Sequence, residues 1–83
     1  MTPRDVQSQI AVVAQLESEL TAARKVAAKT LKAQRKALGL SLRAVRPKAR
    51  RSIAMLSDLE RGKTWETKLA ERLARVYGEA EAA

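Results

Sequence analysis

A long stretch without helix-breaking residues limits what this chain can fold into. Residues 6–38 contain neither glycine nor proline, and apolar side chains recur in this stretch at every third or fourth position. That spacing places the apolar side chains on one face of an amphipathic α-helix. The apolar stripe consists of Val6, Ile10, Val13, Leu16, Leu20, Ala23, Ala27 and Leu31.

Signals at both ends of the stretch predict where this helix begins and ends. Thr2 can serve as the N-cap, Pro3 suits the first helical position, and Asp5 lies in the first turn. Gly39 is typical of the residue that ends a helix. An unbroken helix between these signals would be about 50 Å long at 1.5 Å per residue. A break near residues 28–30 is the alternative.

Three shorter amphipathic segments follow, and each is preceded by a residue that can cap a helix. The expected N-caps are Ser41, Ser52 and Thr67. The side chains expected to face inward are Leu42, Val45, Ala49, Leu56, Leu59, Leu69, Leu73, Val76 and Tyr77, and Trp65 is expected to fill a gap in the core. Gly62 and Gly78 are predicted to end the second and third segments, so that residues 79–83 fray.

The composition supports an all-α fold and excludes several classes of chemistry. Alanine and leucine are the commonest apolar residues, and only two residues are aromatic, which favours helices over sheets. The chain has no cysteine and no histidine, so thiol nucleophiles, disulfides and the commonest general base are excluded. With no glycine-rich phosphate loop and no carboxylate cluster either, we expect no enzyme activity, no metal and no cofactor.

The net charge of +8 is concentrated in the middle of the chain. Residues 24–57 contain eleven lysines and arginines and no acidic residue, whereas the segments on either side are slightly acidic. A block of this kind predicts a polyanionic partner, with nucleic acid favoured over an anionic membrane surface. Because we find no signal-peptide pattern and no apolar run near 20 residues, we expect a cytoplasmic, nucleoid-associated protein with no membrane partner.

The stretch from Leu31 to Gly78 resembles the Cro/repressor-type helix-turn-helix domain, also called the XRE family. The matching pieces are LKAQRKALGLSL (31–42), SIAMLSDLERGKT (52–64) and LAERLARVYG (69–78). The most specific of them is Leu-Glu-Arg-Gly-Lys at residues 59–63, which closes the recognition helix in that family. The resemblance implies that the helix after Ser52 lies in the DNA major groove, while the helix before it crosses the phosphate backbone.

This resemblance assigns candidate roles to individual residues. The candidates facing base edges are Ser52, Ile53, Ala54, Ser57 and Asp58. The candidates facing phosphates are Ser41, Arg43, Arg46, Lys48, Arg50, Arg51, Lys63 and Thr64, and Lys32, Arg35 and Lys36 are candidates for the flanking backbone. Glu60 is expected to make a structural bond with Arg61, Arg72 or a backbone amide.

Three features depart from the family pattern. Pro47 falls inside the first helix of the pair, where an interior proline costs about 3 kcal/mol, so that helix is expected to be short, kinked or shifted. Arg50 and Arg51 occupy the turn, where the family usually has glycine and an apolar residue. The base-facing candidates also offer no bidentate arginine or glutamine contact. Ile53 and Ala54 could touch a thymine methyl group, and Asp58 could accept from a cytosine amino group.

These observations divide the chain into an N-terminal arm (1–28), a helix-turn-helix domain (29–78) and a short tail (79–83). The arm is expected to form a homodimer through Ile10, Val13, Leu16 and Leu20, because their spacing is close to that of a coiled-coil seam. Folding back on its own domain is the alternative for the arm. The predicted fold is a small helical bundle with a helix-turn-helix, preceded by this long amphipathic helix.

The expected function is sequence-specific binding of double-stranded DNA by a transcriptional regulator. The resemblance implies a repressor that binds a palindromic operator as a homodimer, of the phage, mobile-element or antitoxin-like kind. The alternative is a protein-interaction module, in which the same scaffold binds a partner protein in place of DNA.

Overall fold

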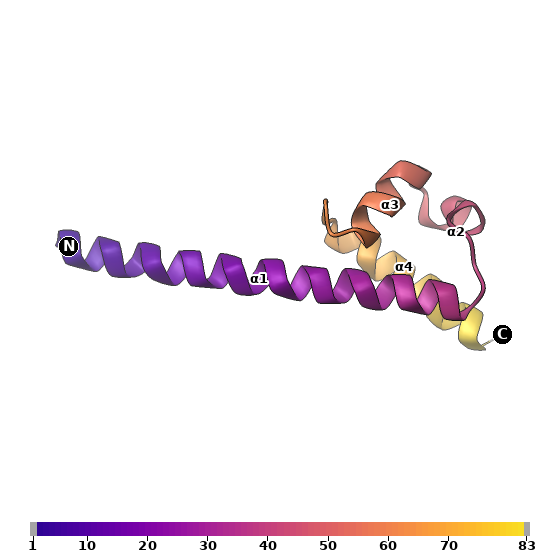
Figure 1. Cartoon of the computed structure of the whole chain (residues 1–83), viewed down its shortest axis with the longest axis horizontal. Coiled ribbons are helices and arrows are strands. Elements are labelled where there is room, and N and C mark those ends of the chain that lie inside the picture. The colour runs from indigo at the N-terminus through magenta and orange to yellow at the C-terminus, as the bar shows by residue number, and fades with distance from the viewer. Residues whose placement is uncertain (1, 83) are drawn as a thin grey trace.

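A single long helix, α1, runs from Pro3 to Ala37 and forms the whole N-terminal part of the molecule (Figure 1). The computed structural model describes residues 2–82. Thr2 caps the helix as expected, since its Oγ1 accepts a hydrogen bond from the Asp5 backbone N–H at 3.3 Å. The Asp5 carboxylate accepts in return from the Thr2 backbone N–H at 3.1 Å. These reciprocal bonds satisfy two amide groups that have no partner within the helix.

The alternative of a break in this helix near residues 28–30 is wrong, because α1 is continuous through them. Ala28 and Leu31 are buried there, so packing against the domain supports this part of the helix. Gly39 ends the helix as expected, with φ +70° in the left-handed region. The Leu40 N–H then donates to the Arg35 carbonyl at 3.1 Å and closes the turn.

Two short helices follow, α2 (Leu42–Ala49) and α3 (Ile53–Glu60). Both expected serine caps are confirmed. Ser41 Oγ accepts from the Ala44 N–H at 3.1 Å, and Ser52 Oγ accepts from the Met55 N–H at 3.2 Å. Such a cap stabilises a helix by about 1 kcal/mol, which matters most in helices of only two turns.

The last helix, α4, runs from Thr67 to Ala82, so the prediction that Gly78 ends it and that residues 79–83 fray is wrong for the residues up to Ala82. Val76 and Tyr77 are buried in the turn before Gly78 and hold this part of the helix against the core. The predicted N-cap is also one residue late. The Glu66 carbonyl accepts the first helical bond, from the Ala70 N–H at 3.0 Å, and Thr67 Oγ1 instead accepts from the indole N–H of Trp65.

The core lies where the four helices meet, and all four contribute to it. Its buried members are Leu31, Val45, Ala49, Leu56, Leu59, Leu69, Leu73, Val76 and Tyr77, with Leu38, Leu40, Leu42, Trp65 and Ala70 packed against them. Apart from Leu42, which is only half-buried, the side chains expected to face inward are buried. This cluster lies within residues 31–77, with Ala28 also buried on α1, and residues 2–26 take no part in it.

The molecule measures 57 × 24 × 17 Å because α1 extends far beyond this core (Figure 1). Every described residue up to Val26 is exposed, so the arm does not fold back on its own domain. Among residues 2–82, we find no helix that combines the length and the apolarity needed to cross a membrane.

Candidate nucleic-acid interface

The turn between α2 and α3 consists of Arg50, Arg51 and Ser52. Arg50 adopts the left-handed conformation, with φ 57° and ψ 38°, and its N–H donates to the Arg46 carbonyl at 2.9 Å. This conformation turns the chain sharply, so that α3 starts directly beside the end of α2. Pro47 removes one possible backbone donor, yet α2 continues through it to Ala49, so the expected shortening does not occur.

The first turn of α3 presents the base-facing candidates to solvent. Ser52, Ile53 and Ala54 are exposed, and the Ile53 side chain keeps 37% of its surface accessible. Ser57 and Asp58 are only half-buried, on the second turn. Met55 was not among the residues predicted for this site, and it is 45% exposed on the same helix. Its place in the first turn of α3, next to Ile53 and Ala54 in the sequence, could have identified it.

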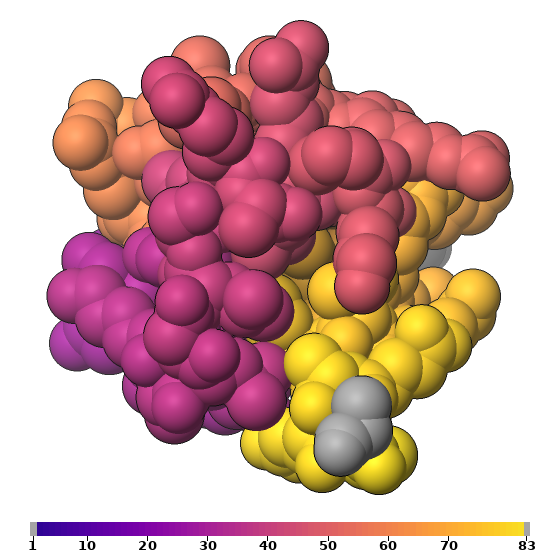
Figure 2. Space-filling view, turned by 90° about the vertical axis from the view of Figure 1, so that its right-hand side faces the viewer, coloured from indigo at the N-terminus to yellow at the C-terminus, as the bar shows by residue number. Residues whose placement is uncertain are grey.

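The structure gathers one group of the phosphate-facing candidates around the turn. Arg43, Arg46, Arg50 and Arg51 line one open hollow together with Pro47 and Ser52. The end-on view in Figure 2 shows α2 and this turn at the top of the molecule, with long side chains projecting outward. Four arginines therefore line a hollow beside Ser52, the N-cap of α3, where the exposed base-facing candidates also lie. Ser41 is exposed at the other end of α2, and its hydroxyl serves as the helix cap.

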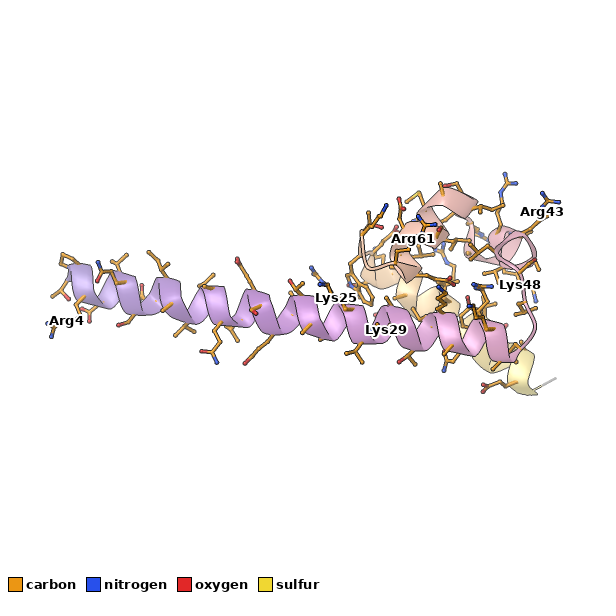
Figure 3. The ribbon with its side chains drawn as sticks, viewed as in Figure 1. Arg4, Lys25, Lys29, Arg43, Lys48 and Arg61 are labelled. Atoms are coloured by element: carbon orange, nitrogen blue, oxygen red, sulfur yellow. The ribbon has the colours of Figure 1, made fainter. Side chains whose placement is uncertain are left out.

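The remaining phosphate-facing candidates lie in two other places. Lys48 lines a hollow with Arg50, Arg72 and Arg75, on the side of α2 that faces α4. In Figure 3, Lys48 and Arg43 lie near the end of the domain remote from the arm.

A third basic group lies where the arm meets the domain. Lys63 and Thr64 line a hollow with Thr21, Arg24 and Lys25 of α1. Figure 3 shows Lys25 on α1 beneath the loop after α3. Arg24 and Lys25 were not among the predicted phosphate-facing residues, although they belong to the central basic block. They place a further basic group at the base of the arm.

Arg51 is not free to bind phosphate with its whole guanidinium group, which corrects its assignment. Its Nε donates to Glu66 Oε2 at 3.2 Å, its Nη2 pairs with Glu66 Oε1, and its Nη1 donates to the Arg50 carbonyl at 2.9 Å. The hydrogen bonds from Arg51 lower the pKa of Glu66 below its ordinary value. Arg51 therefore fixes the turn against the start of α4.

Arg35 and Glu60 form an ion pair inside the domain, which corrects two predictions. Arg35 Nε donates to Glu60 Oε2 at 2.7 Å, and Nη2 donates to Oε1 at 3.0 Å. The side chains are only 11% and 6% exposed, so Arg35 cannot reach flanking DNA and Glu60 does not bond to Arg61 or Arg72. The bond with Glu60 raises the pKa of Arg35 above its ordinary value. The pair joins α1 to the end of α3 and so orients the proposed recognition helix.

No cluster of metal-ligating side chains occurs within residues 2–82. What the surface offers is exposed guanidinium and ammonium groups around a short helix, an arrangement suited to binding an extended polyanion. Comparison with family models, with curated proteins and with solved structures found no match to this chain.

Proposed function

We propose that this protein binds double-stranded DNA through α2 and α3 and acts as a transcriptional regulator. In this proposal α3 enters the major groove, and α2 lies across the phosphate backbone. The domain is then a helix-turn-helix of the Cro/repressor type, as the sequence resemblance implies.

The observation that carries the proposal is the arrangement around Ser52. The capped start of α3 exposes Ile53 and Ala54, and the hollow beside it is lined by Arg43, Arg46 and Arg50. In a helix-turn-helix, residues at the start of the recognition helix contact base edges, while basic side chains beside it contact phosphates. Side chains for base contacts and side chains for phosphate contacts therefore lie close together at the start of α3.

The proposed mechanism is occlusion, in which a homodimer covers a palindromic operator and blocks polymerase. The exposed arm supplies the dimer contact, since Ile10, Val13, Leu16 and Leu20 each keep about half or more of their surface accessible. Burying a leucine side chain is worth about 1.5–3 kcal/mol, which favours a partner on this surface.

Substitutions that separate phosphate contacts from base contacts test the proposal. Arg43→Ala and Arg46→Ala should weaken binding to operator and random duplexes alike. Each should flatten the salt dependence by about one unit per lost contact, which is about two units for a homodimer. Ile53→Ala should instead alter which operator sequences are preferred. Lys29→Ala is the control, since Lys29 is exposed on α1 (Figure 3) and lines none of the three basic hollows, and it should leave DNA binding unchanged. Equal effects of Lys29→Ala and Arg46→Ala would contradict the proposed interface.

The exposure of Ile53 and Met55 favours one second candidate, a module that binds a partner protein. Exposed apolar side chains on a short helix suit a contact with a protein, whereas the arginines around them suit phosphates. If the partner is a protein, Ile53→Asp should abolish its binding while duplex DNA shows no salt-dependent association with the parent protein.

A further inference from the structure

The arm carries a seam whose two halves differ in side-chain size. Positions three and four residues apart along α1 form one line, which consists of Val6, Gln9, Val13, Leu16, Leu20, Ala23, Ala27, Thr30 and Gln34. Apart from Gln9, the half up to Leu20 is bulky and aliphatic. From Ala23 to Thr30 the same line holds only small residues. Two such helices pack best when the bulky half of one faces the small half of the other.

The small half of the seam opens into an apolar hollow between α1 and α4. Ala27, Thr30 and Leu31 form its α1 side, and Trp65, Ala70 and Ala74 form most of the rest. The hollow is thus a direct continuation of the exposed stripe, and it has room for side chains that the small residues do not supply.

The charges of the arm are also divided between its two halves. Between Asp5 and Arg24 the only charged residues are Glu17 and Glu19, whereas Arg24, Lys25 and Lys29 lie at the base of the arm. None of these five charged residues, two glutamates and three basic residues, has an ion-pair partner in the described part of the chain. A partner helix running in the opposite direction would place acidic positions beside basic ones.

We infer that a second copy of this chain occupies the hollow, with the two α1 helices antiparallel. The bulky half of each arm lies on the small half of the other, so that Leu16 faces the partner's Ala27 and Val13 faces the partner's Thr30. In this register Glu17 comes beside the partner's Arg24. A parallel pair in register would instead stack the small residues on one another and leave both hollows uncovered.

The antiparallel arrangement also suits DNA binding, and this step rests on the proposed function. Ala28 and Arg35 are the residues of α1 that face the domain. Measured around the helix axis at 100° per residue, they lie roughly a quarter to a third of a turn from the seam, so the domain lies to one side of it. The two-fold axis of an antiparallel pair runs across the seam, so both domains lie on the same side of the pair. The axis of a parallel pair runs along the seam and places the domains on opposite sides. The two Leu31 residues would be about 30 Å apart along the antiparallel seam, near the 34 Å of one DNA turn.

A distance between the two arm tips tests the orientation. The chain has no cysteine, so Arg4→Cys introduces a single site for a spin label. We expect a distance of about 50 Å between the labels of a dimer, because Arg4 would lie opposite residue 39 of the partner. A parallel pair would give about 10–20 Å, since helix axes pack 8–10 Å apart. The short distance overturns the inference, and so does a monomer in sedimentation.

Disulfide cross-linking tests the register independently. A mixture of Val13→Cys and Thr30→Cys chains should form a mixed disulfide, whereas Val13→Cys alone should not cross-link to itself. Lys29→Cys is the matched control, since it adjoins Thr30 in the sequence but lies about 100° around α1 from it, outside the seam. Self-linking of Val13→Cys would indicate a parallel pair. Neither experiment contains DNA, so a failed orientation and a failed DNA-binding proposal can be told apart.

Discussion

Neutralising Glu60 is expected to destabilise this domain more than any surface substitution. Both carboxylate oxygens accept from Arg35, at 2.7 and 3.0 Å, and the Arg35 Nη1 also donates to the Leu40 carbonyl at 2.8 Å. Glu60→Gln keeps the shape of the side chain but leaves the guanidinium charge buried without a counter-ion. Removing one partner of a buried pair costs about 3–5 kcal/mol.

That cost is large for a chain of 83 residues. The free energy of unfolding expected for this length is about 4–12 kcal/mol, so Glu60→Gln should remove a quarter or more of it. The corresponding decrease in Tm is about 12 °C or more. Urea unfolding followed by circular dichroism measures the loss. Parent and variant must be compared at one protomer concentration, because dimer formation adds to the apparent stability.

Two controls separate the buried pair from a general charge effect. Glu66→Gln breaks the pair with Arg51, whose side chains are about a third exposed, and should have a much smaller effect. Replacing both buried partners, with Arg35→Met and Glu60→Leu, should recover part of the loss, because no charge is then left buried. If Glu60→Gln stays within about 1 kcal/mol of the parent protein, the pair behaves like a surface pair and the reasoning is refuted.

Three further predictions concern the turns and α4. Gly78→Ala should raise the free energy of unfolding by up to about 1 kcal/mol, because a Cβ there meets no atom within 4 Å and the residue lies inside a helix. A loss of stability would mean that α4 ends at Gly78. Arg50→Gly should stabilise the fold by up to about 1 kcal/mol, since glycine tolerates φ 57°, and should also weaken DNA binding; equal or stronger binding would remove Arg50 from the interface. Burial raises the pKa of Tyr77 from 10.0 to about 12, so the folded state holds the phenol proton more tightly, and stability should be complete below pH 10 and fall as the pH rises toward 12. Absorbance of this single tyrosine follows the titration, and Tyr77→Phe should remove this part of the alkaline loss.

Local features of the fold were predictable from the sequence because they depend on neighbouring residues. The caps at Thr2, Ser41 and Ser52 each bond to a backbone N–H three residues ahead, so the pattern is visible in the sequence itself. The apolar periodicity likewise identified most of the buried side chains. The prediction that Gly78 ends α4 was wrong because a glycine that ends a helix cannot be distinguished in the sequence from a glycine on an exposed helix face. The burial of Val76 and Tyr77, which holds the helix in place there, is known only from the structure.

The parts of the site that were not predictable depend on tertiary contacts. Arg35 and Glu60 are 25 residues apart, and Arg51 and Glu66 are 15 apart, so their spacing gives no sign that they pair. The net charge includes Arg35 and Arg51 together with the free arginines. Both are bonded to a carboxylate, however, and Arg35 is also buried. Only the structure distinguishes Arg43, Arg46 and Arg50, which line the hollow beside α3, from the arginines that hold the fold together.

The salt dependence of DNA binding tests the central claim most directly. Fluorescence anisotropy of a labelled duplex, titrated with the parent protein at several salt concentrations, gives the slope of log K against log salt. If the basic surface around α2 and α3 binds phosphates, six to ten contacts per dimer imply a slope of roughly −5 to −9. A slope near zero, or no binding at low salt, would contradict the claim that this protein binds DNA.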